Sequence, residues 1–198
     1  PRKNNIVGAT VNDQSASVEI REELDGNGNV IKKSFNHPYY FTGSGLANIL
    51  SSVYFKSRGL VKGGRKRILF RKEELQDIIP PIISAFSMAT DSQDILVFST
   101  SDKVLLSDAQ SYFSMFMTNN ELNIVFSAIK SKKSWLTDGR AIQMSTYWRD
   151  SNRYIFKDPL DVKRCTRGSL IPMEGQSLAS GQENWLVMDF ACYGEGQP

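Results

Sequence analysis

The sequence contains little of the chemistry on which most active sites depend. It has one histidine, two cysteines and no Cys-x-x-Cys pair, so nothing supplies the ligand spacing of a zinc site. Its glycines match neither a phosphate-binding loop that ends in Gly-Lys-Ser/Thr nor a dinucleotide fingerprint. No apolar run approaches the roughly 18 residues of a membrane-spanning helix. We therefore predict no catalytic, cofactor-binding or metal-binding residues and a protein that is not an enzyme.

Charge and composition are those of an ordinary globular protein. Of the 198 residues, 40% are hydrophobic and 23% are charged, which provides enough apolar material for a buried core. The net charge is only +3, far from the dense basic stripe of a protein that binds by neutralising phosphates. We therefore expect no nucleic-acid partner.

Segments with strand-like patterns outnumber those with helical patterns. Alternating or continuously apolar stretches predict strands, and the segment 94–100 is apolar enough to be central. Two pairs of these segments flank short polar turns and are expected to form hairpins, 18–24 with 30–35 and 112–117 with 122–128. The other expected strands are 54–56, 68–70, 142–148, 153–156 and a closing strand in 185–193.

Helical spacing of apolar residues predicts two helical regions, 46–53 and 73–89. Pro80 and Pro81 interrupt the second region, and proline inside a helix removes a hydrogen bond. One alternative is a kinked helix. The interpretation that we favour is one helix that ends near Ile79 and another that begins with proline in its first turn.

Together these patterns predict an α+β fold, an antiparallel or mixed sheet with two or three helices on one face. The expected organisation is an extended N-terminal arm over 1–14, an α+β domain over 15–158 and a loop-rich C-terminal segment with a closing strand over 159–198. The arm and the stretch 159–184 have too few periodic apolar residues to build a core. We expect them to contact neighbouring chains.

Cys165 and Cys192 leave two alternatives open. A disulfide between them would stabilise the C-terminal quarter by roughly 3.5 kcal/mol through loop-closure entropy, and an oxidising compartment would favour it. The other alternative is two separate buried thiols.

Basic residues gather in one glycine-containing loop, which is the only charge cluster of the sequence. Its members are Lys62, Arg65, Lys66, Arg67, Arg71 and Lys72. The simple interpretation is a solvated loop. The functional alternatives are contact with a partner, an anion or nucleic-acid binding module that uses residues 62–72, or a small hydrolase that relies on carboxylates or lysines.

Two further motifs are better explained by structure than by chemistry. His37 precedes Pro38, which restricts it to extended conformations, and we predict a structural role at the exit of the first hairpin. The sequence 25–29 begins with the oxygen spacing of a calcium loop. Val30 and Asn36 then occupy the positions where such a loop needs glycine and glutamate, so a plain turn is predicted.

The order of motifs between residues 37 and 102 resembles that of envelope lipoproteins of Gram-negative bacteria. These proteins carry His-Pro, a short helix, an apolar-Phe pair followed by Glu-Glu-Leu, a proline-interrupted apolar helix and a strand that ends in Val-x-Phe. The matching residues are His37-Pro38, 46–53, Leu69-Phe70, Glu73-Glu74-Leu75, 80–86 and Val97-Phe98, with a hairpin that extends to Phe126.

The resemblance implies a periplasmic domain tethered to the outer membrane through a lipidated cysteine upstream of Pro1. It further implies a structural subunit that contacts other proteins of an envelope complex. The most specific form of this expectation is an accessory subunit in the outer-membrane core complex of a type IVB (Dot/Icm) secretion system.

Overall fold

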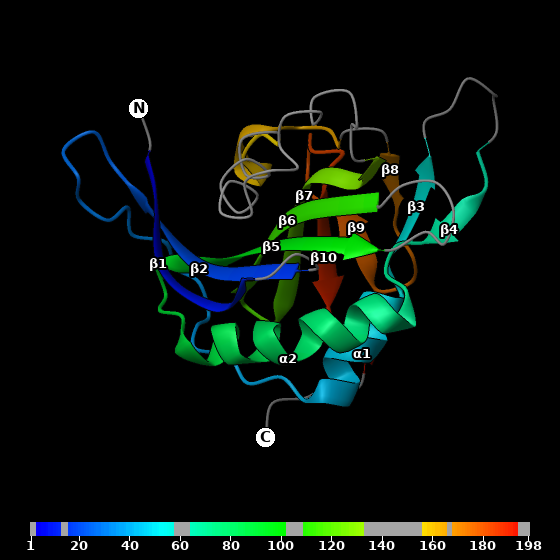
Figure 1. Cartoon of the computed structure of the whole chain (residues 1–198), viewed down its shortest axis with the longest axis horizontal. Coiled ribbons are helices and arrows are strands. Elements are labelled where there is room, and N and C mark those ends of the chain that lie inside the picture. The colour runs from blue at the N-terminus through cyan, green and yellow to red at the C-terminus, as the bar shows by residue number, and fades with distance from the viewer. Residues whose placement is uncertain are drawn as a thin grey trace, which may run out of the picture.

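The computed structural model describes residues 3–12, 16–57, 64–101, 109–132, 156–165 and 168–193. Its main element is a seven-stranded sheet in which every neighbouring pair is antiparallel (Figure 1). In order across the sheet, the strands are β1 (Lys3–Asn12), β2 (Ala16–Leu24), β5 (Gln93–Ser101), β6 (Ala109–Thr118), β7 (Glu121–Lys132), β10 (Trp185–Asp189) and β9 (Gln176–Leu178).

A second sheet has three short strands and is also antiparallel. In order across this sheet, they are β4 (Lys66–Ile68), β3 (Tyr54–Ser57) and β8 (Gly168–Ile171). The strands β3 and β4 lie at the end of the molecule away from β1 (Figure 1). The two ends of the structure therefore carry different sheet edges.

Two helices, α1 (Gly43–Ser51) and α2 (Lys72–Met88), run beneath one face of the main sheet (Figure 1). The side chain of Thr42 caps α1 by accepting a hydrogen bond from the Gly45 N–H at 3.0 Å. Glu73 and Glu74 occupy the first turn of α2, where negative charge suits the helix dipole. No helix in the described part of the chain is long and apolar enough to cross a membrane.

The predicted break at the prolines is wrong, because α2 continues through Pro80 and Pro81. Pro80 is exposed, whereas Ile78, Ile79 and Ile82 are buried against the sheet on the same helix. Burial of this apolar stripe on both sides of the prolines offsets the hydrogen bonds that the prolines cannot donate.

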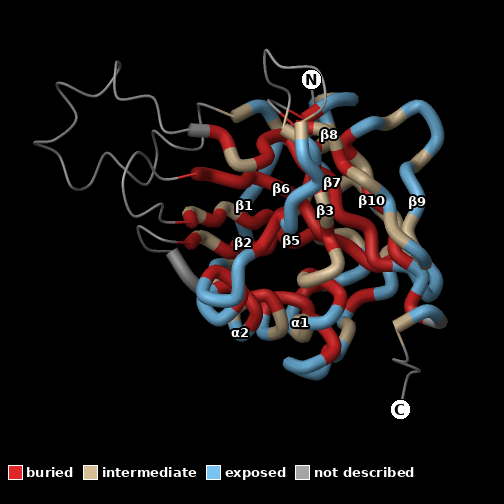
Figure 2. Tube along the Cα trace, turned by 90° about the vertical axis from the view of Figure 1, so that its right-hand side faces the viewer, coloured by how far each residue is buried: buried red, intermediate tan, exposed pale blue. Residues whose placement is uncertain are grey.

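The core lies between the helices and the main sheet, where buried residues concentrate (Figure 2). Aromatic rings pack closely in this core: the ring of Phe86 in α2 meets that of Phe41 edge-on with centroids 5.0 Å apart, and the ring centroids of Phe113 in β6 and Phe126 in β7 lie 5.1 Å apart. A smaller apolar cluster forms on the opposite face of the sheet, around Tyr112. Both faces of the central strands are thus buried.

The predicted α+β class is confirmed in its coarse form, and most of the secondary-structure elements in the described residues are antiparallel strands. The hairpin of β6 and β7 forms as expected, and β5 is paired on both sides. The expected hairpin of 18–24 with 30–35 is wrong. The strand β2 pairs with β1 and β5, so 30–35 is left with one isolated bridge between Leu24 and Val30.

The two terminal segments both contribute strands to the main sheet. Residues 3–12 of the predicted arm form β1, and the C-terminal segment contributes β9 and the expected closing strand, β10, which inserts between β7 and β9. The expected strand at 142–148 and residues 153–155 of the expected strand at 153–156 lie outside the described residues, and Phe156 is not in a strand.

Candidate functional site

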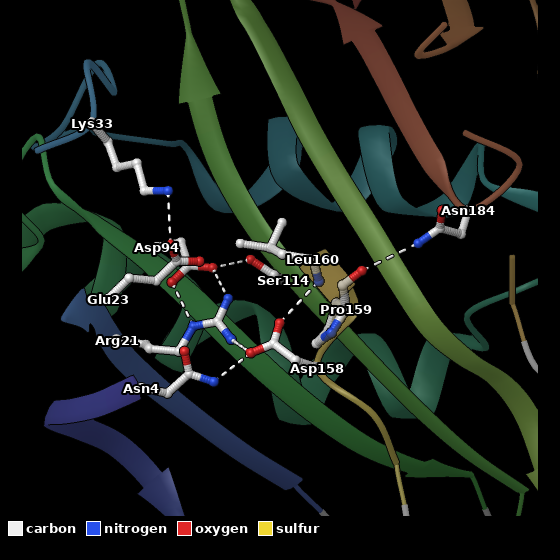
Figure 3. A network of polar contacts seen from close by, with 10 residues as sticks. All are labelled: Asn4, Arg21, Glu23, Lys33, Asp94, Ser114, Asp158, Pro159, Leu160 and Asn184. Carbon is white, nitrogen blue, oxygen red and sulfur yellow. Dashed lines mark hydrogen bonds and ion pairs between the residues drawn. The ribbon is translucent and has the colours of Figure 1, made fainter. Parts of the chain in front are cut away.

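A buried charge network on the sheet face opposite the helices is centred on Arg21 of β2 (Figure 3). Asp94 of β5 is its cross-strand partner, and Arg21 Nε donates to Asp94 Oδ1 at 2.9 Å. Arg21 Nη1 donates to Oδ2 of Asp158 at 2.5 Å. Ser114 of β6 donates to Asp94, and Asn4 of β1 donates to Asp158. The network therefore connects four neighbouring strands to the segment around Asp158.

Asp158 also begins the 3₁₀-helix η3 (Pro159–Asp161), because its Oδ1 accepts a hydrogen bond from the Leu160 N–H at 2.9 Å. Burial would raise the pKa of Asp158, but the Arg21 charge and these hydrogen bonds hold it below its usual value. Burial likewise opposes the charge of Arg21, yet Asp94 and Asp158 raise its pKa above normal.

Arg21 and Asp158 therefore keep their charges near neutral pH instead of exchanging protons. The neighbouring phenol of Tyr112 stays protonated near neutral pH, because burial raises its pKa to about 12. An arrangement of this kind can hold strands in register, and it offers neither a general base nor a general acid. We interpret it as a structural clamp.

A second, partly buried ion pair joins helix α2 to the main sheet. Glu74 accepts from Lys130 Nζ at 2.5 Å and from Ser99 Oγ at 2.6 Å. Lys130 Nζ also lies 3.1 Å from Ser101 Oγ, which is a pairing that some hydrolases use as nucleophile and base. Here the Ser101 hydroxyl donates to the Ala109 carbonyl, and Lys130 Nζ forms an ion pair with Glu74. This geometry serves packing rather than nucleophilic attack.

The sole histidine is part of the core. His37 is 9% exposed, its Nε2 accepts from the Met117 N–H at 3.0 Å, and its ring meets Phe86 edge-on at 5.0 Å. Burial lowers the pKa of His37 to about 4, against the opposing influence of the Gln93 backbone and Asp94. The side chain is therefore neutral at physiological pH, in keeping with its predicted structural role.

The calcium-like sequence forms a self-contained turn. Asp25 Oδ1 accepts hydrogen bonds from the N–H groups of Asn27 and Asn29, at 2.8 and 2.9 Å. The hydrogen bonds from Asn29, followed by the one from Asn27, lower the pKa of Asp25. The carboxylate is engaged within its own turn, as the simpler interpretation predicts.

The structure places three of the described basic residues, Arg65, Lys66 and Arg67, next to one another at the edge of the small sheet. Arg65, Lys66 and Arg67 are exposed in and beside β4, and Arg71 is exposed at the start of α2. Lys66 Nζ lies 4.2 Å above the ring of Tyr54. Lys62 lies outside the described residues.

The proposed disulfide is absent, and Cys165 and Cys192 are separate thiols. Cys165 is buried, with its Sγ 3.9 Å from the carbonyl oxygen of Phe126. Cys192 is exposed in the 3₁₀-helix η4 (Phe190–Tyr193), next to Gly175. The two cysteines are held in different environments by the packing around each, so the alternative of separate thiols applies, although only one of them is buried.

The sequence gives little indication of the buried network. Arg21 lies between Glu19 and Glu23 in an alternating strand, a pattern that is typical of a face exposed to solvent. The one available signal is Asp94, an acidic residue that directly precedes a continuously apolar strand. A charge in that position needs a buried partner if the strand is central.

Comparison of the chain with protein families, with curated proteins and with solved structures finds no match. Across the described ranges, no group of three or more His, Cys, Asp or Glu side chains is arranged to hold a metal ion.

Proposed function

We propose that the chain is a non-catalytic structural subunit of a bacterial cell-envelope assembly, located in the periplasm and associated with the outer membrane. The specific setting that we propose is the outer-membrane complex of a secretion system, such as the type IVB (Dot/Icm) core. A lipid anchor upstream of Pro1 would tether the subunit to the membrane. The motif order from His37 to Val97-Phe98 supports the setting, and the N-terminal strand supports the role.

The observation that carries the proposal is the open edge at β1. This ten-residue strand pairs with β2 on one side, and no described strand pairs with its other side. Residues 3–7 are all exposed, with Ile6 37% and Val7 45% accessible to solvent. Long exposed edges with apolar side chains are sites at which another chain adds a strand.

The backbone groups that face this edge follow from the ladder. The Ile31 N–H donates to the Glu23 carbonyl on the side of β2 that faces away from β1. The backbone N–H and C=O groups of successive residues in a strand point to opposite sides, so those of Glu22 and Leu24 point toward β1. Their partners in β1, Asn5 and Lys3, point toward β2. The N–H groups of Asn4 and Ile6 therefore point outward, before the ladder becomes irregular after Ile6.

The buried polar groups support a non-catalytic role. Arg21 and Glu74 each have partners of opposite charge within the fold, and His37 uses its Nε2 as an acceptor for the backbone. A side chain that is bound in this way stabilises the structure and has no geometry for attacking a substrate.

The experiment removes a single backbone N–H group from the open edge of β1. The full-length gene product, tagged and purified in mild detergent from envelopes of its own organism, is compared with Ile6→Pro and Ile6→Thr. Proline removes the outward N–H at a position where an edge strand tolerates it, whereas threonine keeps the N–H and a β-branched side chain. We expect wild type and Ile6→Thr in a high-mass particle and Ile6→Pro as a folded monomer.

Three results would contradict the proposal. The wild-type protein could be monomeric in the envelope extract, Ile6→Pro could remain in the particle, or the protein could fractionate away from the envelope. Metabolic labelling with palmitate tests the lipid anchor separately, because an unlabelled protein that still enters the particle would remove the anchor and leave the assembly role intact.

A further inference from the structure

The small sheet has an open edge of a different character at β4. The central strand β3 pairs with β8 on one side and with β4 on the other, and no described strand pairs with the outer side of β4. All three residues of β4 are exposed, and Ile68 is 44% accessible. A second possibility for strand addition therefore lies away from β1 (Figure 1).

The charges at this edge are of one sign. Lys66 is directly opposite Lys56 of β3 in the antiparallel ladder, and both are exposed. Like charges in directly opposite positions destabilise an antiparallel pair. Within the described residues, no carboxylate forms an ion pair with Lys56, Arg65, Lys66 or Arg67. The strand therefore presents a concentration of positive charge that the described part of the chain leaves uncompensated.

The outward backbone groups can be assigned from one hydrogen bond. The Leu69 N–H donates to the Val53 carbonyl at 2.8 Å, which directs Leu69 and, two residues earlier, Arg67 toward β3. The N–H groups of Lys66 and Ile68 therefore face the open edge. The same short strand offers outward backbone donors together with cationic side chains.

We propose that the β4 edge binds an extended acidic segment of a partner protein, which adds as a strand beside Lys66–Ile68. The backbone of the segment would pair with the outward groups of Lys66 and Ile68, and its carboxylates would lie on the face of the sheet that carries Lys56 and Lys66. This edge is separate from β1, so the inference stands whether or not β1 docks in an assembly.

The geometry favours an acidic polypeptide over single-stranded nucleic acid. Binding to single strands depends on aromatic faces on which bases stack. The aromatic ring on this face, that of Tyr54, already has Lys66 Nζ 4.2 Å above it. A nucleic acid would also leave the outward backbone groups of β4 without strand partners, whereas an extended polypeptide would use them.

The test measures binding of a fluorescent ten-residue peptide in which glutamate and threonine alternate. The control probes are the same peptide with lysine in place of glutamate, and a single-stranded oligothymidine. Proteins to be compared are wild type, Lys66→Glu, Ile68→Pro, and the matched controls Lys32→Glu and Ile68→Thr. Lys32 is an exposed cation in the segment that follows β2, and Ile68→Thr retains the outward N–H.

We expect the glutamate peptide to bind wild type, and both Lys66→Glu and Ile68→Pro to weaken it at least tenfold. Lys32→Glu and Ile68→Thr should change the affinity less than threefold, and the lysine peptide should not bind. Amide resonances of residues 66–68 should shift on titration, and this readout also reports whether each variant is folded.

Four results would overturn the inference. Wild type could fail to bind the glutamate peptide, Lys32→Glu could weaken binding as much as Lys66→Glu, or folded Ile68→Pro could bind normally. Binding of oligothymidine in preference to the glutamate peptide would instead assign the surface to nucleic acid.

Discussion

His37 provides a direct test of the packing, because it is the only histidine and its titration can be observed alone. Burial lowers its pKa from 6.5 to about 4 in the folded protein. At roughly 1.4 kcal/mol per pH unit, this difference corresponds to about 3 kcal/mol of folding free energy. Between pH 6.5 and pH 4, His37 is protonated in the unfolded chain but remains neutral in the folded chain. The contribution of this pKa difference to the free energy of unfolding is therefore complete above pH 6.5 and is lost as the pH falls toward 4.

The perturbation is His37→Gln, whose side-chain oxygen can still accept from the Met117 N–H. Urea unfolding of both proteins at several values between pH 7.5 and pH 4 gives the free energy of unfolding. The carboxylates titrate in both proteins, so the difference between them isolates the histidine. We expect the advantage of wild type to shrink by about 2 to 3 kcal/mol across this range. Equal pH slopes, or a folded-state imidazole resonance that titrates near 6.5, would refute the reasoning.

Three other perturbations probe the fold. Arg21→Met leaves the buried Asp94 and the partly buried Asp158 without a counter-charge and should lower the free energy of unfolding by about 3 to 5 kcal/mol in chemical denaturation. Gly175→Ala should destabilise more than Gly181→Ala: both have positive φ, but an added Cβ at 175 would lie 2.6 Å from Cys192 Cβ, whereas 181 faces open space. Equal losses would contradict this packing. A thiol reagent should modify Cys192 quickly and Cys165 only after unfolding. No reactive thiol in either state would instead indicate a disulfide.

The elements that the sequence predicts well are those whose burial is one-sided or complete. The helix α1 and the hairpin of β6 and β7 have apolar residues at the spacing of their own secondary structure. The prediction of a break at the proline pair is wrong because burial of the apolar stripe, which stays in phase across Pro80 and Pro81, outweighs the helix-breaking preference of proline.

Two features depend on tertiary context that a single sequence does not contain. Residues 3–7 of β1 are exposed, so no alternation marks them as a strand, and their pairing depends on β2 being available. Arg21 alternates with apolar residues as a solvent-facing residue would. Arg21 is buried because the segment that contains Phe156 and Asp158, far away in the chain, covers the sheet face opposite the helices. Periodicity identifies which residues share a face but not what covers that face.

The central claim is that β1 docks through its outward backbone groups, and amide hydrogen exchange at Asn4 and Ile6 tests it most directly. In the isolated protein both amides should exchange much faster than that of Asn5, which points toward β2. In the assembly purified from the envelope, we expect both to become protected by at least tenfold. Exchange at Asn4 and Ile6 that is equally fast in the isolated and assembled protein would contradict the account.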